Sequence, residues 1–494
     1  MLHRHFLKIF LLSLFFLPVG ASADSLGERV QEHQLENGLT VLLVERHTSP
    51  TVAAYISFKV GAVNENSEQR GIAHMLEHML FKGTETLGTR DFEAELPLLK
   101  KIEETGARLD SLKRQADADP QELERLRARL DELQQEHRQW VVKDEFSRIY
   151  AEQGGVGYNA FTSKDQTSYL INLPANKLEL WAAIESDRLR NAVFREFFTE
   201  REVVQEERRR AVDINPGGKL YENMLATAFQ VHPYRHPILG WDSDIEGFSL
   251  PKIRKFFTDY YAPANMIITL VGAFDHDDTL AMINEYFGDL PAGVKVPAVT
   301  DSEPPQRGER RIHVDFDAQP RMMIAYHKPT LPHPDDYSFD LLASILSQGR
   351  TSRLYQSLVV DQQLVTDVGV FTAPGSRYDN LLVFSLLPRN GVSLIKVENA
   401  LEAELQRLLS EPFSAAEMDK ARRQITTSLL RGIRTNSGLA RMLSIYQVMS
   451  DWKYLVTYED QLNSIKSEDL QRVVTTYLHQ ANRTVATLGR GGEK

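Results

Sequence analysis

Short runs rich in apolar residues predict strands near the start of two long parts of the chain. They fall at residues 38–44 and 51–60 in the first part, and at residues 311–316 and 321–327 in the second. In both parts, stretches with apolar residues every three or four positions follow these strands and predict helices. We therefore expect an α+β fold of two homologous α/β-sandwich halves, each with a mixed or antiparallel sheet covered by helices.

A repeated pattern supports the division into halves. Residues 253–272 and 470–489 match at a constant offset of 217 positions. Both stretches predict an amphipathic helix, an Ala-Asn turn and an apolar strand that ends in glycine. The matching pairs are Ile253 and Leu470, Phe256 and Val473, Tyr260 and Tyr477, Ala264 and Ala481, Asn265 and Asn482, and Gly272 and Gly489. Six matches in register predict that the halves share one plan.

The boundaries between these parts follow from composition. The chain has 494 residues, which is too long for one ordinary core. Residues 291–311 are rich in proline and charge and lack periodicity, so they predict a linker. We expect an N-terminal half at residues 24–290 and a C-terminal half at residues 312–494.

The first 23 residues have the order of a secretory signal. Arg4 and Lys8 precede an apolar run at residues 9–19, and small residues then lead to Ala23. The alternative is a membrane anchor, but the run is about half the roughly 20 residues that a spanning helix needs. No later segment is long and apolar enough to span. We expect cleavage after Ala23 and an exported protein, either periplasmic or secreted.

Composition narrows the chemistry. The net charge of −11 disfavours a nucleic-acid-binding protein. The chain has no cysteine, so disulfides, thiolate metal ligands and a cysteine nucleophile are excluded. Any metal must be held by His, Asp or Glu.

Residues 96–146 do not fit the duplication. Two apolar stripes with helical spacing are interrupted by residues 117–120, which predicts an antiparallel helical hairpin inserted into the first half. The stripes are Leu98, Ile102, Leu109 and Leu112, and then Leu123, Leu126, Leu130, Leu133 and Trp140. The hairpin is a solvated arm without chemistry or, alternatively, a docking arm or lid.

The most informative motif is His-Met-Leu-Glu-His at residues 74–78. His74 and His78 are four positions apart, so on a helix they project from one face and can bind one zinc ion. Glu77 borders this face and can take a proton from metal-bound water. A chain with 14 His and 68 acidic residues contains such a pattern by chance about 0.05 times. The alternative is an accidental pair of surface histidines.

A catalytic zinc usually has three protein ligands, so a third must come from elsewhere. The best candidates lie in residues 199–208, which predict a second helix with Thr199 as its N-cap. Glu200 and Glu207 share a face of this helix, and Glu206 points about 100° away. The alternative from periodicity alone is that each of these acids only faces solvent, as is usual in a Glu-rich helix.

These residues resemble the pitrilysin/insulinase peptidases, which carry an inverted zinc motif and include the mitochondrial processing peptidases. The resemblance covers residues 74–83, 154–162 with Tyr169, 200–207 and 232–240. It implies a two-half architecture that encloses a chamber. It also implies zinc peptidase activity on peptides or unfolded segments.

The resemblance assigns roles to individual residues. It implies that His74, His78 and Glu207 bind one zinc per chain. It further implies that Glu77 is the general base and that Glu200 is a supporting carboxylate of the catalytic site. Glu207 follows His78 by 129 residues, and removing the 51 inserted residues leaves 78, so the insertion accounts for the long spacing.

The family's substrate-binding edge strand resembles Asn159-Ala160-Phe161-Thr162. Such a strand binds an extended peptide through main-chain hydrogen bonds. Without the resemblance, an ordinary strand would be the preferred interpretation.

One feature departs from the family. Many active members carry an Arg and, seven residues later, a Tyr in the second half, and the matching positions here are Val359 and Thr366. Neither side chain can donate the same hydrogen bonds. We therefore expect a dimer, and in particular a heterodimer whose second subunit supplies the missing pair. The alternative function is a non-catalytic or partner-dependent peptide-binding subunit.

Overall fold

The computed structural model describes residues 26–491, so the expected signal at residues 1–23 lies outside the described part. The first half contains α1 (Leu26–Arg29), β1 (Gln31–Gln34), β2 (Thr40–Glu45), β3 (Thr51–Phe58), α2 (Ile72–Met79), α3 (Phe92–Lys113), α4 (Pro120–His137), α5 (Glu145–Glu152), β4 (Val156–Thr162), β5 (Thr167–Pro174), α6 (Leu178–Arg190), α7 (Phe197–Arg208), α8 (Pro216–Ala228), α9 (Asp242–Glu246), α10 (Leu250–Tyr260), β6 (Met266–Gly272) and α11 (His276–Phe287). The second half contains β7 (Arg310–Asp315), β8 (Arg321–Lys328), α12 (Asp335–Ser347), β9 (Val365–Ala373), β10 (Asn380–Pro388), α13 (Leu394–Ser410), α14 (Ala415–Gly432), α15 (Asn436–Met449), α16 (Lys453–Ser464), α17 (Ser467–Tyr477) and β11 (Arg483–Gly489). Short 3-10 or π-helical turns lie at Ala62–Asn64 (η1), Ala175–Lys177 (η2), Arg209–Asp213 (η3), Pro233–Arg235 (η4), Pro263–Asn265 (η5), Tyr355–Asp361 (η6) and Gln480–Asn482 (η7).

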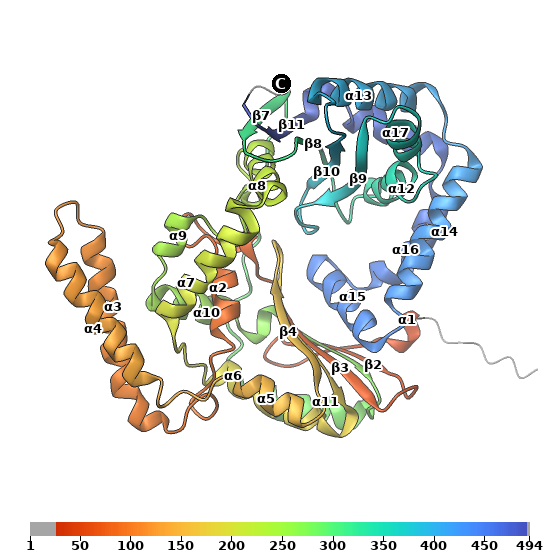
Figure 1. Cartoon of the computed structure of the whole chain (residues 1–494). Helices are drawn as coiled ribbons and strands as arrows, with labels where there is room; N and C mark the ends of the chain where they lie inside the picture. The colour runs from red at the N-terminus through yellow and green to blue at the C-terminus, as the bar shows by residue number, and fades with distance from the viewer. Residues whose placement is uncertain (1–25, 492–494) are drawn as a thin grey trace, which may run out of the picture.

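Two separate sheets confirm the expected α+β class (Figure 1). The first sheet has the order β1-β2-β6-β3-β5-β4, and the second has the order β7-β11-β8-β10-β9. Each sheet is mixed, because β2 runs parallel to β6 and β7 runs parallel to β11, while the other neighbours are antiparallel. Apart from β1, each strand of the first sheet has a counterpart at the same place in the second.

The repeated pattern corresponds to equivalent elements. The helix, 3-10 turn and strand α10, η5 and β6 have the same lengths as α17, η7 and β11, and every boundary differs by 217 positions. The repeated asparagine has the same contact in both places. The Nδ2 of Asn265 donates to the carbonyl of Tyr260 at 3.2 Å, and that of Asn482 donates to the carbonyl of Tyr477 at 2.9 Å. The asparagine therefore joins the helix end to the turn in each half.

The halves exchange one helix each. Helix α8 belongs to the first half in sequence, but Leu220 and Met224 pack in one cluster with Ala325 and Val383 of the second sheet. Helix α15 belongs to the second half but covers the first sheet. There the Ser444 hydroxyl lies 3.0 Å from the hydroxyl of Thr269, and the Ser437 hydroxyl lies 3.0 Å from that of Tyr55. Each sheet is therefore packed against a helix from the other half.

The hairpin is shifted relative to the expected residues 96–146. Helix α3 begins at Phe92, because the Asp91 carboxylate caps it by accepting from the amide of Ala94 at 3.0 Å. Helix α4 ends at His137, so Trp140 lies beyond the helical stripe to which the pattern assigned it. Residue 146 already belongs to α5.

Other expected boundaries differ by a few residues. Strand β2 starts two residues later than residue 38, and β3 ends at Phe58 rather than at residue 60. Strand β7 begins at Arg310, inside the expected linker, and β8 extends to Lys328. Helix α7 begins at Phe197 after Glu196, so Thr199 is not its N-cap. Phe197 and Phe198 are both buried, and the helix begins three residues before the expected first residue, Glu200.

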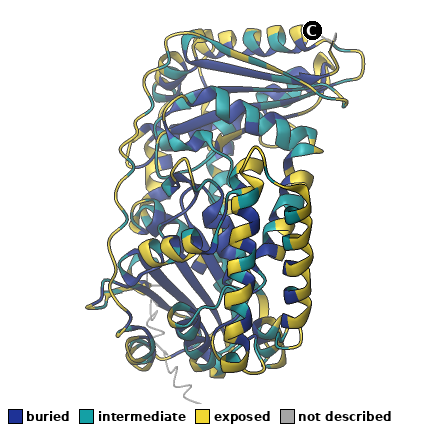
Figure 2. Ribbon diagram, turned by 90° about the vertical axis from the view of Figure 1, so that its left-hand side faces the viewer, coloured by how far each residue is buried: buried dark blue, intermediate teal, exposed yellow. Residues whose placement is uncertain are grey.

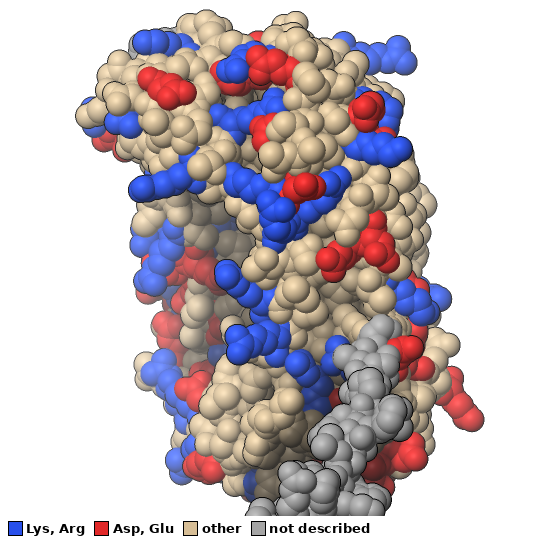
Figure 3. All heavy atoms as spheres, turned by 90° about the vertical axis from the view of Figure 1, so that its right-hand side faces the viewer, with Lys and Arg blue, Asp and Glu red and all other residues tan. Residues whose placement is uncertain are grey.

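Most strands are buried along most of their length, except the outer strands β1, β4 and β7, and many helices show one buried and one exposed side (Figure 2). Figure 3 shows the face that carries α14 and α16, where Lys and Arg side chains gather across the middle and Asp and Glu side chains surround them. The surface therefore carries both signs of charge on this face. Among the described helices, none is both long and apolar enough to cross a bilayer.

Candidate metal centre

Helix α2 begins at Ile72, directly after Gly71. Gly71 has φ 87°, and a Cβ at this position would lie 2.4 Å from the carbonyl oxygen of Leu239, so only glycine fits. The buried carboxylate of Glu65 accepts from the amides of Gly71 at 2.7 Å and Ala73 at 2.9 Å. It thereby satisfies donors that the first turn of a helix leaves unpaired. These contacts set the start of the helix at Ile72, two residues before His74.

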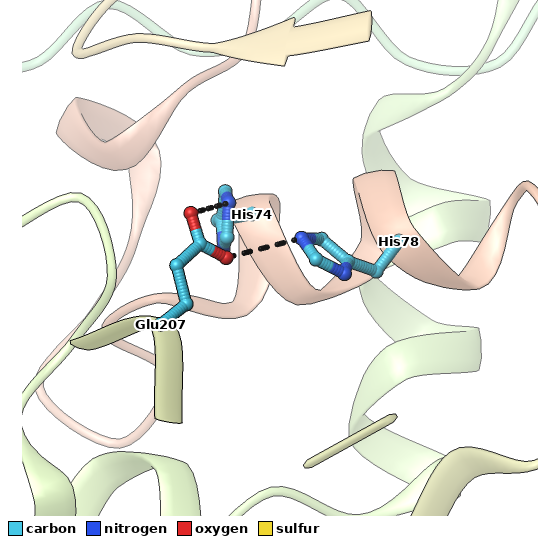
Figure 4. A group of neighbouring side chains, drawn as sticks. All are labelled: His74, His78 and Glu207. Atoms are coloured by element: carbon cyan, nitrogen blue, oxygen red, sulfur yellow. Dashed lines mark ion pairs between the residues drawn. The ribbon is translucent and has the colours of Figure 1, made fainter. Parts of the chain in front are cut away.

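Three side chains from two helices converge on one point (Figure 4). His74 and His78 project from α2, and Glu207 reaches them from α7. The Nε2 of His74 lies 3.6 Å from Glu207 Oε1, and the Nε2 of His78 lies 3.4 Å from Glu207 Oε2. All three ligand atoms lie within 4.8 Å of one another.

This spacing fits one zinc ion. Donor atoms bound at about 2.0–2.1 Å in a tetrahedral arrangement are separated by roughly 3.3–3.4 Å. In the part of the chain that the structure describes, no other group of three His, Asp or Glu residues has this arrangement. The chemistry of the donors also fits, because two imidazoles and one carboxylate leave a fourth position open for water or substrate.

Glu200 contacts His78 and is itself paired with Lys82. The Nδ1 of His78 lies 2.9 Å from Glu200 Oε1, so its proton is directed at the carboxylate and Nε2 faces Glu207. The other oxygen of Glu200 lies 2.5 Å from the ammonium of Lys82. The Nδ1 of His74, in contrast, is buried without a hydrogen-bond partner among the described residues. Lys82 lies inside the stretch that resembles the family, but no sequence pattern assigns it a role.

The two histidines have opposite pKa shifts in the metal-free protein. Burial, together with the neighbouring His78, lowers the pKa of His74 to about 4, so its imidazole is neutral at pH 7. Burial also lowers the pKa of His78, but hydrogen bonds to Glu200 and Glu207 outweigh it and raise this pKa to about 9. Binding of a metal at Nε2 of His78 therefore releases a proton.

Glu77 contacts the end of the edge strand directly. The hydroxyl of Thr162, the last residue of β4, donates to Glu77 Oε2 at 2.6 Å. Burial raises the pKa of Glu77, and the hydrogen bond from Thr162 opposes this shift. The predicted base and the predicted substrate strand thus meet at one hydrogen bond, which no spacing in the sequence indicates.

The predicted substrate strand lies at the edge of the first sheet. Strand β4 is the last of six strands, and its neighbour in the sheet is β5 alone. Asn159 is exposed, Ala160 is buried, and Phe161 and Thr162 are half-buried. The outer edge of β4 therefore has no described strand beside it.

A cavity of about 460 Å³ adjoins the base and the edge strand. Its walls come from the end of α2, from the residues after the hairpin and from β4. They include Glu77, His78, Lys82, Lys143, Glu145 and Asn159. The cavity therefore presents both acidic and basic side chains next to Glu77.

Val359 and Thr366, the two positions that differ from the family pattern, lie in the second half. Val359 is buried in the π-helical turn η6 and packs in a hydrophobic core. Thr366 is exposed on β9, and its hydroxyl donates to the carbonyl of Leu387 at 3.2 Å. An arginine at position 359 would need a different packing of this core, so the departure involves the fold of η6 as well as the side chain.

The inverted motif His-x-x-Glu-His, found here at residues 74–78, is the signature of the inverzincin class of zinc proteins. The model of the insulinase family (peptidase family M16) matches residues 40–139 and 141–242. The model described as the peptidase M16 inactive domain matches residues 247–425. The chain belongs to the insulinase family, as the sequence motifs predicted.

Similar proteins cover almost the whole chain. Zinc protease PqqE of Helicobacter pylori is 28% identical over 487 residues, which span 96% of this chain and 97% of the relative. A probable mitochondrial-processing peptidase subunit beta of Schizosaccharomyces pombe is 24% identical, with 92% and 90% covered. The crystal structure of a protease from Helicobacter pylori has a TM-score of 0.78 and 25% identity, with 93% and 99% covered. The family and the two-half fold therefore extend over nearly the whole chain.

Proposed function

We propose that this chain is an exported zinc-dependent endopeptidase that hydrolyses peptides or unfolded polypeptide segments. The observation that carries the proposal is the convergence of His74, His78 and Glu207 from two distant helices. Glu77 lies on the same helix, hydrogen-bonded to the last residue of an edge strand. Similarity to proteins named zinc proteases supports this assignment.

Each group has a role that follows from its position. Zinc, when bound to these ligands, lowers the pKa of a water molecule and polarises a carbonyl group. Glu77 holds a proton from the attacking water and passes it to the leaving amine. The outer edge of β4 binds the peptide backbone, and Glu200 orients His78.

The test is cleavage of an unstructured peptide by the purified protein, together with its zinc content. We expect about one zinc per chain, loss of cleavage after chelation, and recovery when zinc is restored. Glu77→Gln should retain zinc and lower kcat by roughly 10²–10⁴-fold, the usual contribution of a general base. Glu246→Gln, at an exposed position on α9, is the matched control and should retain activity. Equal cleavage by Glu77→Gln would contradict the assignment.

A second candidate is a peptide-binding subunit that depends on a partner for catalysis. Val359 and Thr366 favour it, because neither side chain can donate as an Arg/Tyr pair does. The relative from Schizosaccharomyces pombe is named as a subunit. We infer a dimer, with a related chain that supplies the missing pair. Full turnover by the purified chain alone, as a monomer or homodimer, would exclude this requirement.

Export is the remaining part of the proposal. The first 23 residues support it through their basic, apolar and small segments. The mass and N-terminal sequence of the mature protein are the measurement. A mature chain that begins at Asp24 supports export, and an intact Met1 in the fractionated protein contradicts it.

A further inference from the structure

The inserted hairpin packs against the helix that carries Glu200 and Glu207. Asp110 of α3 forms a two-pronged ion pair with Arg201 of α7, at 2.7 Å and 3.0 Å. Both side chains are nine-tenths buried, and Arg201 also donates to the carbonyl of Phe248 at 3.1 Å. A planar guanidinium held on both sides fixes its own orientation. Because Arg201 directly follows Glu200, this contact also fixes the rotation of α7 at the metal centre.

One glycine explains how closely α3 and α7 approach. A Cβ added at Gly106 would lie 1.9 Å from the ring of Phe198, which is buried at the start of α7. Glycine inside a helix costs roughly 1 kcal/mol relative to alanine. Its presence in α3 is therefore a packing requirement, since the phenyl ring occupies the space that a side chain would need. Little room remains nearby, where a cavity of about 60 Å³ separates the hairpin from the start of α7.

The base of the hairpin joins the same helix to the end of α2. The carboxylate of Glu95 in α3 lies 2.8 Å from Arg195 and 2.6 Å from His137 of α4, and all three side chains are buried. Arg195 precedes α7 by two residues and donates to the carbonyl of Thr84 at 2.7 Å and of Lys82 at 3.3 Å. The hairpin thus supplies the negative charge that holds this arginine between the two metal-binding helices.

We propose that the hairpin α3–α4 is a positioning element of the metal centre, with Asp110 and Glu95 as its positioning residues. It holds α7 against the end of α2 so that Glu207 meets His74 and His78. This proposal rests on the proposed zinc site. For the base of the hairpin, this role is favoured over a solvated arm or a lid. A mobile lid would not share buried ion pairs with α7, the helix that carries Glu207.

The test compares zinc affinity with the stability of the metal-free protein. Asp110→Asn keeps the size of the side chain but removes its charge. We expect zinc affinity, measured by competition with a chromophoric chelator, to fall about tenfold, the lower end of the range for residues that orient ligands. The increase in Tm that zinc produces should shrink in parallel.

A matched control lies on the same hairpin. Glu122 of α4 pairs with Arg108 of α3 at 2.5 Å near the tip and, unlike Asp110, forms no ion pair with α7. Glu122→Gln should leave zinc affinity unchanged. If Asp110→Asn does not fold, Arg201→Lys takes its place, because lysine keeps the charge but loses the two-pronged geometry. The exchanged pair, Asp110→Arg with Arg201→Asp, should recover part of the zinc affinity.

The outcomes separate this proposal from the site itself. If the wild-type protein binds no zinc, both proposals fail. If the wild-type protein binds zinc, and Asp110→Asn or Arg201→Lys lowers the metal-free Tm but leaves zinc affinity unchanged, the hairpin has only a structural role and the positioning proposal is wrong. A weaker affinity in these variants, with an unchanged affinity in Glu122→Gln, supports it.

Discussion

At the residue scale, the carboxylate of Glu200 acts without touching the metal position. It accepts from Nδ1 of His78 and pairs with Lys82, so it determines which imidazole nitrogen faces Glu207. The Nδ1 of His74 has no such partner among the described residues, and burial together with the neighbouring His78 keeps its imidazole neutral. The two histidines are therefore prepared for a metal in different ways, although their spacing in the sequence makes them look equivalent.

Replacing Glu200 should weaken metal binding. In Glu200→Gln the negative charge behind His78 is lost, and we expect zinc affinity to fall by roughly 10–100-fold. Chelator competition measures the change. Glu196→Gln is the control, because Glu196 is 3.5 Å from Lys82 and does not contact His78. An unchanged affinity in Glu200→Gln would show that the hydrogen bond does not orient the ligand.

The contact between Thr162 and Glu77 gives a prediction about pH. The hydrogen bond from Thr162 stabilises the ionised carboxylate, so Thr162→Val should raise the pKa of Glu77 further. The acid limb of kcat/KM should move to higher pH, and activity below neutral pH should fall about tenfold. Zinc content should stay the same. A pH profile identical to that of the wild-type protein would contradict the role of this hydroxyl.

At the element scale, buried polar contacts fix how helices pack in the second half. Asp340 of α12 accepts from the hydroxyl of Tyr458 of α16 at 2.5 Å. Burial and the nearby Asp336 raise the pKa of Asp340 to about 6. The hydrogen bond from Tyr458 favours the carboxylate form, but burial and Asp336 disfavour its charge more strongly.

The stability of the protein should reflect this shift. Below about pH 4, Asp340 is protonated in the folded and the unfolded chain. As pH rises from about 4 to about 6, Asp340 loses its proton in the unfolded chain before it does in the folded chain. The free energy of unfolding therefore falls over this range. The asparagine in Asp340→Asn does not titrate, so this variant lacks the fall. Its free energy of unfolding, relative to that of the wild-type protein, should rise by on the order of 1–3 kcal/mol between pH 4 and pH 7. Urea unfolding at both pH values measures it, with exposed Asp361→Asn as the control. A constant difference across this range would refute the prediction.

At the scale of the whole molecule, the exchanged helices make the two halves depend on each other. Helix α8 closes the core of the second sheet, and α15 closes one face of the first. Each sheet would expose that apolar face if its partner half were removed. Burial of apolar surface is the main favourable term in folding, so this exposure should destabilise each half.

Separate expression of the halves should therefore fail. We expect fragments 24–290 and 312–494 to be insoluble or to unfold without a cooperative transition. Co-expression should restore a folded complex. Circular dichroism during heating measures this. A cooperative transition in fragment 24–290 alone, near the Tm of the full chain, would mean that the exchanged helices are not essential.

The sequence by itself determined the family, the two-half plan, the metal motif and the repeated helix and strand. These features are local, because a period of 3.6 or 2 residues states which face is buried. The constant offset of 217 positions between residues 253–272 and 470–489 predicts that these two stretches fold alike. His74, Glu77 and His78 share one short helix, so their spacing alone was enough to propose a metal site.

Only the tertiary structure decided the features that join distant parts of the chain. Before the family resemblance, periodicity left Glu200, Glu206 and Glu207 as equal candidates, and the contact with His74 selects Glu207. The hydrogen bond from Thr162 to Glu77, the place of Phe198 over Gly106 and the exchange of α8 and α15 left no pattern in the sequence. Each depends on how packed elements meet in space, and a single sequence records the surface that an element buries but not the partner that covers it.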